Sequence, residues 1–274
     1  MSRGGWLWVA AAAMTLAAAV WQWRSGPEYP YRGAVAFGAT RVAVTLPRSH
    51  ATTAGARIAV PAPAGDPGGT LWWRPSGSAG AFAPIPLRRE GESFAAALPT
   101  APPAGRIEYF VEVRSGAGVV RVPARRDETV VLRYHGPVPA AILVPHITVM
   151  FLSILLGVRA GLAALTSGAA PRGLTLATLA LLTAGGLVLG PATQRLAFGA
   201  WWTGVPLGWD LTDNKTLLMW IGWALAAWAV LRRRADARRL VVFAATLMLA
   251  VYLVPHSLNG SRLDRASAPT VPAP

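Results

Sequence analysis

The residues of this chain whose types could do chemistry gather in one stretch, residues 199–216, which reads GAWWTGVPLGWDLTDNKT. It contains Trp201, Trp202 and Trp209 of the twelve tryptophans, and Lys215, the one lysine among 26 basic residues. Aromatic rings can wall a flat ligand, and a cation can pair with its carboxylates. Since most of the chain uses Ala, Leu, Val, Gly, Pro and Arg, we expect the rare polar residues here to serve a site.

Two histidines belong with this stretch. His146 and His256 each end an L-V-P-H tetrapeptide, the first inside an apolar run and the second at the end of another. An ionisable side chain within a membrane span is costly, so it marks a functional site by default. The structural alternative for His146 is a hydrogen bond to a Thr or a backbone carbonyl of a neighbouring helix. His135 lies just before the second apolar run and is a weaker candidate.

Two histidines on different helices at similar depth are a common way to hold a b-type haem between helices. We therefore predict His146 and His256 as iron ligands. Arg195 and Lys215 are the predicted partners of the haem propionates. The predicted walls of the site are Trp201, Trp202 and Trp209, with Asp210 beside them.

The stretch resembles the tryptophan-rich W-G-x-x-W-x-W-D motif of the haem-handling membrane proteins of cytochrome c biogenesis. Trp201-Trp202 and Gly208-Trp209-Asp210 stand in comparable order, although residues 203–207 intervene and the T-D-N-K continuation differs. The resemblance covers some 20 residues and the two histidines. It implies an exported loop that presents haem to a partner, with roles for Trp202, Trp209, Asp210, His146 and His256.

The polar residues after Trp209 have other interpretations. Asp210, Thr212, Asp213 and Asn214 could supply oxygen ligands to Ca²⁺, although the glycine and terminal glutamate of the usual loop are missing. Thr212 or Asp213 could instead cap a helix that starts here. A lysine in a first helical turn needs a partner, and we expect Asp210 to be that partner of Lys215.

Apolar runs predict five membrane helices. The chain is 53% hydrophobic, too apolar for an ordinary soluble domain. Residues 6–23 form an uncleaved anchor or a cleaved signal peptide, with Trp pairs at both ends. The four further predicted spans are residues 138–158, 174–189, 217–231 and 240–254. Too few polar residues lie within these spans for a transport path.

Arginines set the predicted orientation. The loops 159–173 and 232–239 carry two and five arginines, so both are expected in the cytoplasm. The exported side then holds residues 25–137 and the loop 193–216. The net charge of +14 would suit nucleic acid, but the tightest arginine cluster flanks a span, so we predict no nucleic-acid partner. The absence of Cys excludes disulfides and thiolate-held metals.

Residues 25–137 predict an exported β domain. Eight short β-type runs alternate with turn residues, as in a small sandwich. The runs are residues 41–46, 57–60, 70–73, 82–87, 93–98, 106–114, 119–122 and 129–133. The segment from Leu98-Pro99 through Gly105 and Ile107 to Tyr109 and Val113 resembles fibronectin type III and immunoglobulin-like modules, which implies fold and not function.

The predicted fold class is a membrane α-helical bundle, an N-terminal anchor plus four spans, with an inserted all-β immunoglobulin-like sandwich domain. The domains are 1–24, 25–137 and 138–258, followed by a disordered tail, 259–274.

The predicted function is a bacterial inner-membrane protein that binds b-type haem at the outer face of the bundle, for electron transfer or for haem handling in cytochrome assembly. The alternative is an accessory or assembly subunit of a membrane complex that docks through the Trp-rich loop and the β domain. The expected partners are the lipid bilayer and other membrane or periplasmic proteins.

Overall fold

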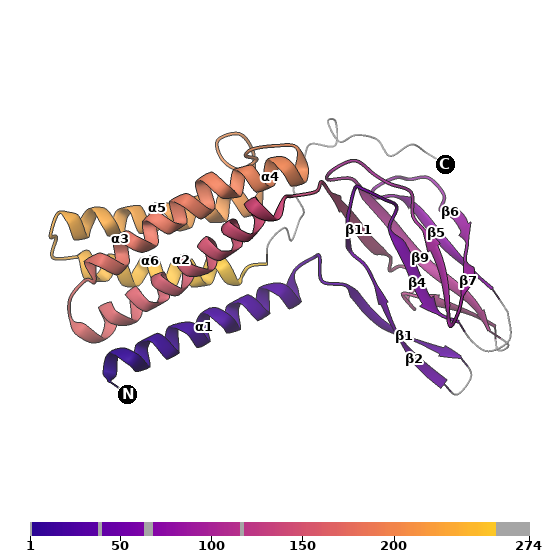
Figure 1. Ribbon diagram of the computed structural model, residues 1–274, viewed down its shortest axis with the longest axis horizontal. Helices are drawn as coiled ribbons and strands as arrows, with labels where there is room; N and C mark the ends of the chain where they lie inside the picture. The colour runs from indigo at the N-terminus through magenta and orange to yellow at the C-terminus, as the bar shows by residue number, and fades with distance from the viewer. Residues whose placement is uncertain (1, 38–39, 63–67, 116–117, 256–274) are drawn as a thin grey trace. The chain divides into compact units, whose positions relative to one another are not determined.

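The computed structural model describes residues 2–37, 40–62, 68–115 and 118–255, and these fall into two compact units (Figure 1). Of the described residues, the helical unit contains those up to Pro27 and those from Val138 to position 255, and the β unit contains those within Glu28–Pro137. The predicted tail, 259–274, and His256 lie outside the described residues.

The helical unit contains four helices that are long and apolar enough to cross a membrane, which is consistent with the predicted membrane protein. These are Gly4–Ser25, Ala140–Ser167, Arg172–Phe198 and Leu211–Leu231. The elements are α1 (Arg3–Ser25), α2 (Ala140–Ser167), α3 (Arg172–Leu182), η1 (Thr183–Leu189), α4 (Gly190–Phe198), α5 (Leu211–Leu231) and α6 (Ala237–Leu253). The fifth predicted span, residues 240–254, corresponds to α6, which has 17 residues and is not among the four helices above.

The third span is one continuous helix made of α3, the π-helical segment η1 and α4. Its π geometry shows at Gly190, whose N–H donates to the carbonyl of Gly185 five residues back. Pro191 follows directly and has no N–H to donate, so the normal ladder is interrupted there. The helix nevertheless continues to Phe198, and the non-helical connection to α5 is confined to residues 199–210, shorter than the predicted 193–216.

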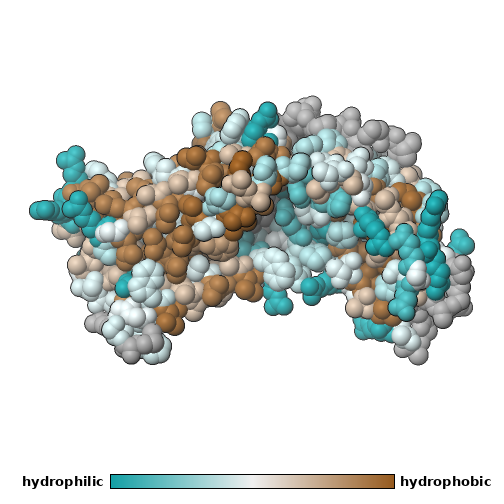
Figure 2. All heavy atoms as spheres, viewed as in Figure 1, coloured by the Kyte–Doolittle hydropathy of each residue, from teal (hydrophilic) through white to brown (hydrophobic). Residues whose placement is uncertain are grey.

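Two hydrogen bonds show how the helices alternate in direction. At one end, Arg238 Nε near the start of α6 donates to the carbonyl of Ala164 near the end of α2, at 2.8 Å. At the other end, Trp21 Nε1 of α1 donates to the carbonyl of Leu253 at the end of α6, at 2.9 Å. We call the first the arginine end and the second the Trp-loop end. Brown, apolar residues cover most of the visible surface of the helical unit between these ends (Figure 2).

Small residues let α6 pack tightly on its neighbours. A Cβ at Gly161 of α2 would lie 2.5 Å from the Cβ of Ala245, so only glycine allows this approach. Trp223 of α5 is fully buried in the same apolar core, together with Ile154 and Met248. In a membrane, where lipid is as apolar as the helices, such close contact is the main source of helix association.

The β unit contains a six-stranded sheet, a three-stranded sheet and a hairpin around one apolar core. The hairpin pairs β1 (Tyr31–Phe37) with β2 (Thr40–Leu46). In the six-stranded sheet the strand order is β3 (Ser49–Ala51), β11 (Val130–His135), β9 (Arg106–Ser115), β5 (Gly69–Pro75) and β6 (Ala83–Pro86), and β10 (Gly118–Val122) pairs with β9. In the three-stranded sheet the order is β4 (Arg57–Pro61), β8 (Ser93–Ala97) and β7 (Arg88–Glu90). All pairs are antiparallel except β3 with β11.

All eight predicted strands are present, with ends shifted by a residue or two. Apolar and polar residues alternate along β9, and its inward-facing residues Ile107, Tyr109, Val111 and Val113 are fully buried. Three strands were not predicted: β1, β3 and β7. The last two are three residues long, and β1 includes Gly33 and small alanines that give little strand signal.

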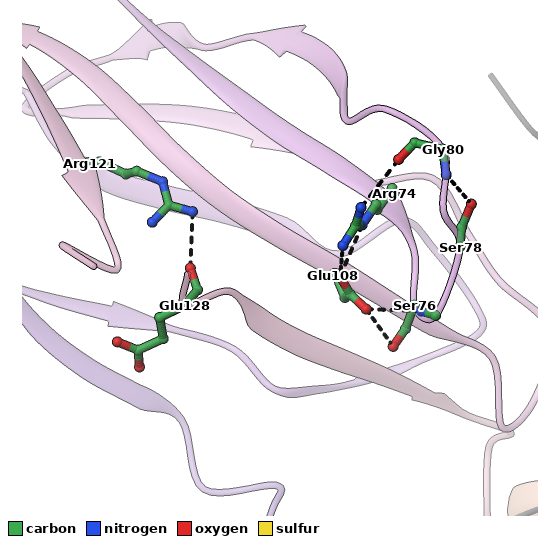
Figure 3. A network of polar contacts seen from close by, with 8 residues as sticks. Arg74, Ser76, Ser78, Gly80, Glu108, Arg121 and Glu128 are labelled. Atoms are coloured by element: carbon green, nitrogen blue, oxygen red, sulfur yellow. Dashed lines mark hydrogen bonds and ion pairs between the residues drawn. The ribbon is translucent and has the colours of Figure 1, made fainter. Parts of the chain in front are cut away.

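A half-buried carboxylate ties the turn after β5 to β9 (Figure 3). Glu108 Oε2 accepts two hydrogen bonds from Arg74, at 3.0 and 3.1 Å, and Oε1 accepts from the N–H of Gly77 at 2.9 Å and from Ser76 Oγ at 3.1 Å. Burial alone would raise the pKa of Glu108, but these donors outweigh it and hold the pKa below the ordinary 4.5. The carboxylate therefore stabilises the folded sheet at neutral pH.

Replacing this carboxylate tests the network. We expect Glu108→Gln to reduce the stability of the β unit by about 1.5–3 kcal/mol at pH 7, the usual contribution of hydrogen bonds to a charged group. Because folding lowers this pKa, the stabilisation is present above the ordinary glutamate range and is lost as pH falls through the lowered value. The backbone amides of residues 69–77 and 106–114 should exchange hydrogen faster in Glu108→Gln than in the unmodified protein at pH 7. This difference should disappear at low pH. The exposed Glu92→Gln is the control, and equal exchange in both variants at pH 7 contradicts the assignment.

Candidate functional site

A buried carboxylate at the start of α5 holds the Trp loop, residues 199–210. Asp213 Oδ2 accepts from the backbone N–H of Thr203 at 2.6 Å and of Gly204 at 3.0 Å. It also accepts from Thr203 Oγ1 and from Gln194 Nε2 of α4, both at 3.1 Å. Asp213 is only 5% exposed, so these four donors replace the water that a buried charge requires. One side chain thus fastens both the loop and the end of the third span to α5.

Neighbouring residues complete this attachment. Asp210 Oδ1 accepts from the N–H groups of Thr212 and Asp213, so Asp210 is the N-cap of α5, a role that we predicted for Thr212 or Asp213. Asn214 Oδ1 accepts from the N–H of Val205 at 2.7 Å. Glycine is needed at Gly204, because a Cβ there would lie 2.6 Å from the Cβ of Asp213. The side chains of Asp210, Asp213 and Asn214 are therefore occupied in building the loop.

The fixed loop holds large apolar side chains in the open. Trp209 is 88% exposed, Leu207 77% and Trp201 61%. Trp202 is half-buried, and its Nε1 donates to the carbonyl of Val205 at 3.0 Å within the loop. The structure thus places Trp201 and Trp209 on the outside of the helical unit.

Lys215 is buried against the end of α6. Its Nζ donates to the carbonyl of Val254, the C-cap of α6, and Gln22 Nε2 of α1 donates to the same carbonyl at 2.9 Å. The carbonyls at a helix C-terminus have no partner within the helix and form the negative end of its dipole, so a buried ammonium is favourable there. The predicted pairing of Lys215 with Asp210 is not observed: none of the salt bridges among the described residues includes either side chain.

His146 lies in α2 and contacts the π-helical segment. Its Nδ1 is 3.0 Å from the carbonyl of Gly185, which also accepts the N–H of Gly190. Because a carbonyl only accepts, Nδ1 carries the hydrogen, and in the neutral ring Nε2 keeps a lone pair. The structural alternative given for His146, a hydrogen bond to a backbone carbonyl, is thus observed, and Nε2 stays available to a ligand.

A cavity of about 300 Å³ adjoins His146. Its lining includes Phe151 of α2, Thr193 and Phe198 of α4, and Tyr252 of α6. The Thr193 hydroxyl is buried there, and no hydrogen-bond partner reaches it from the described part of the chain. Of the predicted site residues, His146 and Asp210 line this cavity, whereas the three tryptophans, Arg195 and Lys215 do not.

The remaining predicted residues lie apart from the cavity. Arg195 donates through Nη1 to the carbonyl of Gly199, where it helps to end α4. His135 is half-buried at the end of β11, with Nδ1 3.0 Å from the carbonyl of Gly136. His256 is outside the described residues, and within those residues no three His, Cys, Asp or Glu side chains gather as metal ligands.

Comparison with known proteins adds no relative, since no protein-family model matches the chain and no curated protein sequence does.

Sequence reasoning missed two contributors to the loop. Gln194 bridges α4 to both Thr203 Oγ1, at 2.8 Å, and Asp213. A single glutamine near the end of an apolar run was a signal, because an uncharged polar side chain there needs a partner. The other is the structural role of Gly208, which was named only as part of the motif: a Cβ added there would lie 2.4 Å from the carbonyl oxygen of Thr203, a close approach that sequence spacing alone does not reveal.

Removing the Asp213 carboxylate should release the loop. We expect Asp213→Ala to raise hydrogen exchange at Thr203 and Gly204 by roughly ten- to a hundredfold, the equivalent of losing a charge-assisted hydrogen bond. Asp213→Asn keeps one acceptor oxygen and should show a smaller increase. Unchanged exchange in both variants would show that the loop does not depend on this residue.

A double-mutant cycle tests the partner of Lys215. Lys215→Met should increase exchange in the last turn of α6 and lower the melting temperature, because the carbonyl of Val254 loses a charged donor. Combined with Asp210→Asn, the effects should add to within about 0.5 kcal/mol, since the two side chains form no ion pair. A larger coupling energy would contradict this and would support the ion pair between Lys215 and Asp210 that was predicted from the sequence.

Proposed function

We propose that this chain is an accessory or assembly subunit of a bacterial inner-membrane protein complex, and that the Trp loop docks on an apolar surface of a membrane partner. The observation that carries the proposal is a loop held by Asp213, Asp210 and Asn214 that presents Trp201, Leu207 and Trp209 outward. Tryptophan dominates binding energy at protein interfaces, and a loop ordered beforehand loses little entropy on binding.

A purely lipidic role explains less of this geometry. Exposed tryptophans also occur at both ends of α1, where Trp6 is 60% and Trp23 63% exposed, and these suit the interfacial belt of a membrane. Such anchors sit on a simple helix surface. The Trp loop in addition uses a buried aspartate, an asparagine and two close-contact glycines to fix its shape, which membrane anchoring does not require.

The arginines support the orientation in this proposal. The arginine end contains five arginines in or beside short loops: Arg172 is the first residue of α3, Arg232 and Arg233 follow α5, and Arg238 and Arg239 lie in the first turn of α6. An excess of arginine in short loops marks the cytoplasmic side. The Trp loop and the β unit then belong to the exported side, and we propose an immunoglobulin-like sandwich for that unit because its two sheets share one core.

Site-specific photocrosslinking in native membranes tests the docking role. A photoreactive amino acid in place of Leu207 should give a crosslink to one discrete membrane protein, and Trp201→Ser with Trp209→Ser should reduce its yield at least about tenfold, as expected for interface hot spots. The control places the photoreactive group at Phe243, exposed at the other end of the unit. Crosslinks from position 207 to lipid alone would contradict the proposal.

Haem binding is a second candidate, supported by the free Nε2 of His146. The cavity beside it is also lined by Tyr252, four residues before His256 in the chain. The described residues supply one ligand but neither the predicted aromatic walls nor the predicted propionate partners. Bound haem would supply one-electron chemistry or be cargo for assembly; His146 would hold the iron, and Gly185 would fix the orientation of its ring.

A visible spectrum decides this second candidate. If haem binds, the purified protein with added haem should show a Soret band that His146→Ala abolishes and that His135→Ala leaves unchanged. No Soret band after haem addition would eliminate haem and leave the docking role intact, because the Trp loop does not include His146.

A further inference from the structure

The arginine end contains a hollow whose chemistry the docking role does not use. An open hollow of about 780 Å³ is lined by residues from the end of α2 and the start of α6, including Leu165, Asp236, Arg239 and Phe243. A second hollow of about 310 Å³ adjoins it, shares Gly168, Ala235 and Arg238, and adds Arg172 and Arg233. We call the two together the arginine hollow. Teal, hydrophilic residues gather at this end of the helical unit (Figure 2).

Positive charge dominates the arginine hollow. Five arginines line it against a single carboxylate, that of Asp236. Arg234 forms a salt bridge with that carboxylate, with 2.9 Å between Arg234 Nε and Asp236 Oδ1, and its guanidinium lies over the ring of Trp228. Arg238 is committed to the carbonyl of Ala164. The other three are Arg172, Arg233 and Arg239, all exposed, and no salt bridge among the described residues includes them.

The same hollow has an apolar side. Leu165 is 55% exposed and Phe243 57% exposed, and both line the larger hollow next to Arg239. Both residues belong to helices of the apolar helical unit, close to the ends where α2 stops and α6 starts. A ligand here would meet cations at the membrane surface and apolar side chains on the side toward the bilayer.

We propose that the arginine hollow binds an anionic phospholipid, with its phosphate among Arg172, Arg233 and Arg239 and an acyl chain along Leu165 and Phe243. Guanidinium groups match phosphate oxygens in charge and geometry. Basic hollows between membrane helices on the cytoplasmic side are suited to acidic headgroups. A free anion would use the arginines alone, whereas the exposed leucine and phenylalanine favour a ligand that carries hydrocarbon.

Native mass spectrometry of the full chain in a neutral detergent tests this proposal. Phosphatidylglycerol is added and compared with phosphatidylcholine of the same acyl chains. We expect tighter retention of phosphatidylglycerol, and Arg233→Gln with Arg239→Gln should weaken it about 25-fold, since each basic residue near an anionic lipid contributes about fivefold. The matched control is Arg88→Gln with Arg114→Gln, two exposed arginines of the β unit, which removes the same charge.

Three results would overturn the proposal. Equal retention of the two lipids would show no headgroup preference, and equal weakening in the control variant would reduce the effect to net charge. Inorganic phosphate that displaces phosphatidylglycerol at the same concentration would identify a simple anion site. Both arginine variants change exposed side chains, so their melting temperatures without lipid should match that of the unmodified protein, which keeps a folding defect from imitating lost binding.

Discussion

The buried carboxylate of Asp213 is the constraint on which the Trp-loop end depends. A carboxyl group can be buried in this position because four donors surround one of its oxygens, two of them backbone N–H groups of the loop. Once these bonds form, residues 203 and 204 are fixed against the first turn of α5. The shape of the loop, and with it the exposure of Trp201 and Trp209, follows from satisfying a single charge.

Charges at helix termini organise the rest of the helical unit in a similar way. The ammonium of Lys215 and the amide of Gln22 close the C-terminal end of α6, while the guanidinium of Arg238 reaches the last carbonyls of α2. Each of these side chains comes from a different helix than the carbonyl it meets. The short, 17-residue α6 is thereby held at both ends, in addition to its close packing on α2 through Gly161.

The sequence predicted the elements well and their polar contacts poorly. Apolar run length and β-type runs between turn residues are local properties, so the apolar helices and eight strands could be predicted. The role of Lys215 could not, because its partner is a backbone carbonyl 39 residues away that carries no side-chain signal. The Trp residues were predicted to wall a site, whereas Trp201 and Trp209 are exposed. Composition shows that a residue is unusual, but it does not show which way the side chain points. Haem and its ligands stay a prediction.

The yield of a crosslink from position 207, measured in Asp213→Ala and His146→Ala backgrounds, tests the central claim most directly. If Asp213 shapes a docking surface, Asp213→Ala should lower the yield of the partner crosslink several-fold, since a disordered loop must be reordered on binding. His146→Ala should leave it unchanged. The reverse result, a crosslink that survives loss of Asp213 and disappears with His146, would contradict the account and move the function from the loop to the cavity.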